Sequence, residues 1–174
     1  MITAPTQGHV GGFSGLDRTA RTVMLPDVEL SGTTWRTTAL DQAEHGAAIA
    51  RLLAGSVLDI AGFRLEVVAP ESGAPGDVPG AGYLGLRVVA PDGRTFCDIS
   101  DLDLDAQTVA AARLRGPCTY LLLPAGGASV LSPELQRAAG DPALIASRGP
   151  GRIAAGFPPT VLRTDQEGTI TVPL

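Results

Sequence analysis

The 174-residue sequence predicts one layered domain of mixed α and β structure, of the α/β or α+β class. Three observations predict this class. Apolar runs recur along the chain, and hydrophobic residues make up 44% of it, which is enough for a packed core. Short runs of strand-forming residues alternate with single stretches of helical periodicity. The 22 glycines and 14 prolines indicate many turns between short elements.

The first half of the chain predicts three strands and a helix. Residues 1–12 are expected to form a flexible amino-terminal segment, and a single domain is expected over 13–174. A buried strand is predicted at 21–25, where Pro26 ends it. The stretch 41–54 predicts a helix, because it opens on a capping-box pattern and carries apolar residues on one helical face. Strands are then expected on either side of the short Ala61-Gly62 turn, at 57–60 and 63–68.

The second half predicts more strands and two further helices. A hairpin is expected around Pro91-Asp92-Gly93, because glycine supplies the positive φ that such a turn requires. The expected elements, in order, are strands at 83–90 and 95–99, a helix at 106–114 capped by Asp105, a strand at 119–123, a helix opened by Ser132 and Pro133, a weak strand at 144–147, and a closing hairpin of strands 160–164 and 169–172.

The charge balance and the absence of apolar runs bear on partners and location. All 13 basic residues are Arg, and the net charge is −5, which argues against general attraction to nucleic acid. The segment 148–152 could form a local Arg patch, although scattered surface Arg is the commoner case. The first residues lack the basic and apolar regions of a signal peptide, and no apolar run reaches about 18–20 residues. We therefore expect a soluble, cytoplasmic chain with no membrane insertion.

The two cysteines are expected to be buried free thiols. Cys97 and Cys118 lie 21 residues apart, with no second Cys or His at the spacing of metal ligands. This spacing excludes a zinc ribbon or zinc finger. Both cysteines lie in apolar runs, where Cys commonly behaves as a small hydrophobic residue.

Several segments also match more specific sequence patterns. Residues 161–171 read Val-Leu-Arg-Thr-Asp-Gln-Glu-Gly-Thr-Ile-Thr, close to the pattern V-x-R-T-D-x-x-G-T-I-T. Four other stretches, at 8–12, 55–70, 84–96 and 120–127, fit further family patterns in the same order. Together they resemble a metallo-β-lactamase-type domain of the ComEC competence-protein kind. The resemblance implies a partial metallo-β-lactamase-like sandwich of mixed sheet, hairpins and flanking helices, without the family's amino-terminal strands.

The resemblance also places the family's metal ligands, and most are missing here. Only His9 and Asp101 match ligand positions, as vestigial ones. The paired histidines of the family stand here as Ala125 and Gly126, and a late histidine as Gly156. A metal that activates water needs at least three protein ligands. We therefore expect no catalytic residue, no cofactor-binding residue and no bound metal.

Each remaining polar candidate has a plainer interpretation. His9 is expected to be exposed in a glycine-rich loop, and His45 to be exposed on a helix. Asp101 belongs to an acidic cluster that could attract a cation such as Ca²⁺, although acidic residues ahead of a helix are more commonly caps and dipole partners. The cluster consists of Asp98, Asp101, Asp103 and Asp105.

These observations favour a non-catalytic binding or structural module. A half-sandwich leaves an apolar sheet face and unpaired edge strands, both of which favour docking on a partner chain or self-association into an oligomer. The alternative is a metal-dependent phosphodiesterase or nuclease-type hydrolase, completed by another chain. The resemblance implies a role in DNA uptake, and nucleic acid is a partner on that ground alone. A third possibility is an unrelated α/β domain with a chance likeness.

Overall fold

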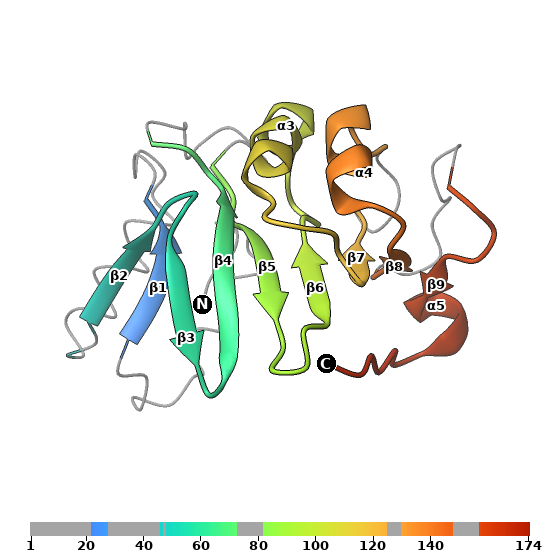
Figure 1. Ribbon diagram of the computed structural model, residues 1–174, viewed down its shortest axis with the longest axis horizontal. Coiled ribbons are helices and arrows are strands. Elements are labelled where there is room, and N and C mark those ends of the chain that lie inside the picture. The colour runs from blue at the N-terminus through green and yellow to red at the C-terminus, as the bar shows by residue number, and fades with distance from the viewer. Residues whose placement is uncertain (1–21, 28–45, 47, 73–81, 125–129, 148–156) are drawn as a thin grey trace.

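The computed structural model describes residues 22–27, 46, 48–72, 82–124, 130–147 and 157–174, and it has the predicted mixed α and β structure. A seven-stranded sheet forms its centre, and its strands lie side by side in chain order (Figure 1). The strands are β3 (Val57–Ile60), β4 (Phe63–Ala69), β5 (Gly85–Val89), β6 (Thr95–Asp98), β7 (Tyr120–Leu122), β8 (Ala143–Ala146) and β9 (Leu162–Arg163).

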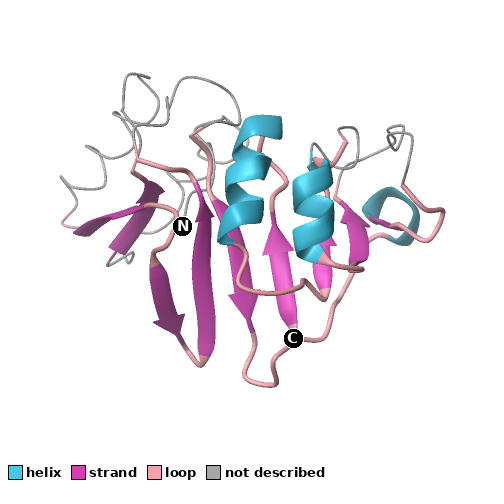
Figure 2. Cartoon of the chain, turned by 45° about the horizontal axis from the view of Figure 1, so that its top comes forward, coloured by secondary structure: helices cyan, strands magenta, loops and turns pink. Residues whose placement is uncertain are grey.

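The sheet changes character at β6. From β3 to β6 each strand pairs antiparallel with the next, whereas β6, β7, β8 and β9 pair parallel. Parallel neighbours need a crossover connection, and helices commonly provide it. Here α3 (Leu104–Arg113) connects β6 to β7, and α4 (Pro133–Ala139) connects β7 to β8. Both helices therefore lie on one face of the sheet (Figure 2).

The main core fills the space between this face and the two helices. Alternate residues of a strand point to opposite faces, so only every second strand residue enters this core. Cys97, Leu121 and Val68 do so, where they meet Ala110 of α3 and Leu135 of α4. A smaller core lies against the other face at β4 and β5.

A two-stranded parallel sheet contributes to that smaller core. It consists of β1 (Thr22–Pro26) and β2 (Ala48–Leu52), and Leu52 packs with Val67, Leu84 and Leu86. The helix predicted at 41–54 was therefore wrong over 48–52. In-register pairing with β1 and burial of Leu52 outweigh the helical propensity of this Ala-rich segment, because tertiary contacts commonly override local propensity.

The closing hairpin was also predicted wrongly. A single short strand, β9, is followed by one helical turn, α5 (Thr164–Glu167), and residues 169–172 belong to no strand. Gly168, at φ 73°, ends this turn and donates its N–H to the Thr164 carbonyl at 3.0 Å. The residues expected to form the hairpin turn therefore form the helical turn and its carboxyl-terminal cap.

The other described elements lie close to their predicted positions, with one change of cap. The cap of α3 is Asp103, whose Oδ1 accepts the N–H of Ala106 at 2.8 Å, and Asp105 lies in the first turn instead. Ser132 caps α4 as predicted. The described part of the chain holds no helix long and apolar enough to cross a membrane. The predicted boundary between residues 12 and 13 lies outside the described residues.

Candidate functional site

Of the two vestigial ligand positions, Asp101 lies within the described residues. Asp101 is half-buried in the turn between β6 and α3. It lies near Tyr83, whose phenol pKa is raised first by burial and then by the Asp101 charge. His9, His45, Gly156, the Ala125-Gly126 pair and the segment 148–152 lie outside the described residues.

The acidic cluster serves local structure. Asp98 Oδ1 accepts the N–H of Ser100 at 3.1 Å and its hydroxyl at 2.7 Å, while Asp103 caps α3. Within the ranges that the structure describes, no three His, Cys, Asp or Glu side chains lie where they could hold a metal ion. Asp98 thus stabilises a turn and Asp103 caps a helix, as acidic residues ahead of a helix commonly do.

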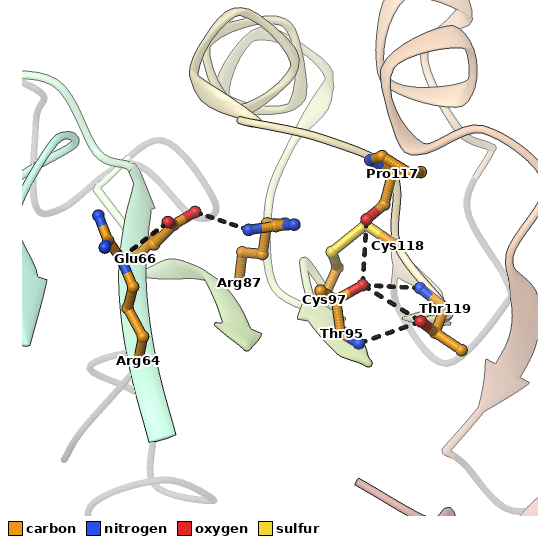
Figure 3. A network of polar contacts seen from close by, with 8 residues as sticks. All are labelled: Arg64, Glu66, Arg87, Thr95, Cys97, Pro117, Cys118 and Thr119. Carbon is orange, nitrogen blue, oxygen red and sulfur yellow. Dashed lines mark hydrogen bonds and ion pairs between the residues drawn. A yellow bond between two sulfur atoms is a disulfide. The ribbon is translucent and has the colours of Figure 1, made fainter. Parts of the chain in front are cut away.

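The two cysteines form a disulfide, so the prediction of free thiols was wrong (Figure 3). The Cα atoms of Cys97 in β6 and of Cys118, which precedes β7, lie 5.9 Å apart, a usual separation for a disulfide. Both residues are buried, with exposed fractions of 1% and 5%. Thr95 and Thr119 reinforce the same junction, because each backbone N–H donates to the other's hydroxyl oxygen, at 3.0 and 2.8 Å.

A buried ion network occupies the helix-covered side of β4 and β5 (Figure 3). Glu66 accepts from Arg87 Nη1 at 2.9 Å and pairs with Arg64 Nε at 3.1 Å. The side chains of Glu66 and Arg87 are only 10% and 11% exposed. Arg87 Nε is buried without a hydrogen-bond partner in the described structure. The network neutralises buried charge in the sheet and leaves one donor unsatisfied.

One cavity of the described structure is mostly apolar. It has a volume of about 490 Å³ and lies between α4, β8 and residues 157–160. Its lining includes Leu131, Leu144 and Phe157, and among the described lining residues only Asp141 is ionisable. The lining also includes the polar side chains of Gln136 and Thr160, and its mostly apolar character suits apolar contact.

The face of the sheet away from the helices carries an unusual row of side chains. Five residues in cross-strand register span five adjacent strands, β3 to β7. All five are apolar or aromatic, and all five are partly exposed. They are Leu58, Leu65, Val88, Phe96 and Tyr120, and they are called the apolar row below.

The apolar row departs from the usual pattern of a solvated sheet face. Antiparallel strands with one face in water normally alternate apolar and polar residues. Here Cys97 and Leu121 enter the helix-covered core, so their neighbours Phe96 and Tyr120 point the other way and would be expected to be polar. All five side chains are partly exposed, and Leu58 also packs against the smaller core. Apolar surface that remains accessible across adjacent strands marks a binding surface in many proteins.

The row has a charged neighbour at its β7 end. Arg94 interacts with the Tyr120 side chain and donates from Nε to Asp92 Oδ2 at 2.6 Å. This contact with Arg94 lowers the pKa of the Asp92 carboxyl, and Asp92 raises the pKa of Arg94. The apolar row therefore ends at an exposed ion pair, as a polar rim borders many protein interfaces.

The sequence contains no local signal for the apolar row. Its members come from five strands and are separated by turns, a helix and the whole β4–β5 connection. Only the strand register brings them together.

The comparisons with protein families and with curated proteins identify no relative of this chain. No protein-family model matches the chain, and a search of curated proteins finds no significant match. The described structure places the protein in the α+β class, and the metallo-β-lactamase resemblance stays an expectation from the sequence.

Proposed function

We propose that the chain is a non-catalytic binding or structural module that docks on a protein partner or on a second copy of itself. The apolar row carries this proposal, because it is a partly exposed apolar surface in register across five strands. Apolar side chains that stay partly exposed across adjacent strands favour association through the hydrophobic effect. The scarcity of metal ligands in the sequence supports a module without hydrolytic chemistry.

The resemblance to metallo-β-lactamase-type domains is compatible with this proposal. A degenerate relative of that fold would keep the scaffold while losing the ligands that activate water. The described sheet, with helices on one face, is compatible with part of a layered α/β sandwich.

The disulfide bears on the compartment. Disulfides are rare in the reducing cytoplasm and persist in oxidising environments. The Cys97–Cys118 disulfide therefore favours an oxidising compartment over the cytoplasmic location that the sequence predicts.

The test replaces two members of the apolar row by residues that keep strand propensity but add a hydroxyl. Val88→Thr/Phe96→Thr is expected to lower the mass in solution, measured by light scattering over a concentration series, and to weaken binding of an apolar fluorescent dye. The control is Val57→Thr, because Val57 is exposed on the other face of the same sheet. A wild-type chain that is monomeric throughout and binds no more dye than the double variant contradicts the proposal.

Metal content, measured on the same protein after exposure to Zn²⁺ and Mn²⁺, tests the hydrolase alternative. The proposal expects less than about a tenth of a metal per chain after dialysis, since two ligands cannot hold such an ion tightly. One or more retained metals per chain would favour the hydrolase.

A further inference from the structure

The last residues of the chain lie against the same sheet face as the apolar row. Ile170, Val172 and Leu174 line one cavity of about 330 Å³ together with three residues of β6, β7 and β8. Those three are Phe96, Leu122 and Ile145, and Phe96 belongs to the apolar row. Residues 170–174 therefore cover part of the proposed docking surface.

Partly buried apolar residues alternate with exposed threonines in this segment. Ile170 and Val172 are partly buried, whereas Thr169 and Thr171 are exposed. In an extended chain, alternate side chains point the same way, so the apolar set faces the sheet and the threonines face solvent. The segment therefore presents apolar residues at every second position to the sheet face.

The attachment of this segment is shallow. Residues 169–174 belong to no strand, and in the described structure no backbone hydrogen bond ties residues 170–174 to the sheet. Pro173 has no N–H to donate to a strand ladder. Leu174 remains 36% exposed, and the cavity shows incomplete packing between segment and sheet. Among the described residues, side-chain contacts hold the segment to the sheet, and these contacts can be exchanged.

We propose that Ile170–Leu174 is a displaceable strap that covers Phe96 of the apolar row and the adjacent Leu122 and Ile145, and that competes with a partner for this part of the sheet face. The inference rests on the proposed function, since it assigns that surface a built-in competitor. It also defines the partner's chemistry: an extended peptide segment with apolar side chains at alternate positions. Binding of such a segment requires the strap to leave Phe96, Leu122 and Ile145.

The experiment detaches the strap and offers its own sequence as the probe. The variant is Ile170→Asp/Val172→Asp, and the probe is a fluorescently labelled synthetic peptide with the sequence of residues 168–174. If the strap occupies the site most of the time, a competing peptide can bind only while the site is open. Its apparent affinity is then its intrinsic affinity multiplied by the fraction of time that the site is open. We therefore expect the peptide to bind the variant at least about tenfold more tightly than the wild type, measured by fluorescence anisotropy.

The chain supplies a matched control. Thr169→Asp/Thr171→Asp adds the same two charges to the same segment but on its exposed side. This variant is expected to bind the peptide as weakly as the wild type. Adding Leu122→Thr to the detached variant should remove the binding, since Leu122 lines the surface under the strap. Circular dichroism checks that each variant keeps its secondary structure.

Either of two results would overturn the strap. The peptide could bind the wild type and the detached variant equally, or it could fail to bind the folded detached variant. The assay needs neither self-association nor a natural partner, so it separates the two proposals. Peptide binding by a chain that shows no association or dye binding through the apolar row would retain the strap and reject the proposed function.

Discussion

At the residue scale, Glu66 is a charged residue that the fold buries. It lies between two arginines on the helix-covered side of the sheet, and its pairing with Arg87 is almost fully removed from water. Removing one partner of a buried pair leaves an uncompensated charge, which costs far more than losing an exposed pair. The free donor of Arg87 makes this network sensitive to any loss of acceptor.

Glu66→Ala is therefore expected to lower the free energy of unfolding by about 3 kcal/mol, measured by urea denaturation. Glu71→Ala is the control, because Glu71 pairs with Arg113 at a similar distance, 3.2 Å, with both side chains about half exposed. Its cost should stay below about 1 kcal/mol. Equal losses in the free energy of unfolding for the two variants would show that the buried Glu66–Arg87 pair stabilises the protein no more than an exposed pair does.

At the element scale, Gly85 allows the turn before α3 to pack closely on β5. A Cβ at this position would lie 2.9 Å from Leu102 Cδ1 and 3.1 Å from Val68 Cγ2, both closer than normal contact. All three residues are buried, so neither neighbour can move into solvent. The absence of a side chain at Gly85 thus determines how closely strand and turn approach.

Gly85→Ala is expected to destabilise the protein by about 1–3 kcal/mol, the usual cost of overfilling a packed core. Leu102→Ala alone should also destabilise it, through the cavity that it creates. Because the two residues share one space, the double variant should lose less stability than the two single losses added together. Additive losses in thermal or urea unfolding would contradict the close contact.

Elements with local signals could be predicted from the sequence, whereas elements defined by distant partners could not. The Ser132 cap is a local signal, and it is confirmed by the bond from Leu135 N to its hydroxyl at 3.2 Å. The strand at Ala48–Leu52 depends on pairing with β1, more than twenty residues earlier in the chain, which no local pattern reveals. The apolar row has the same cause, since only the register of five strands aligns its members.

At the scale of the whole molecule, the disulfide links the antiparallel and parallel parts of the sheet. It joins the end of β6 to the segment before β7, and α3 lies within the loop that it closes. Its sulfur atoms belong to the main core, between the sheet and both helices. Burial protects the bond from reductants while the protein is folded, because exchange requires attack by a thiolate on a sulfur atom.

A reductant should therefore leave the disulfide of the native protein intact, whereas loss of the disulfide should make the protein easier to unfold. A mild thiol reductant alone should release no alkylatable thiol, whereas the same reductant in urea should release both Cys97 and Cys118. Cys97→Ala/Cys118→Ala should lower the free energy of unfolding by about 3 kcal/mol, because closing a loop of 21 residues restricts the unfolded chain by roughly that amount. Thiols that react in the native protein, purified without reductant, would show that the disulfide is not formed, and the argument for an oxidising compartment would fail with it.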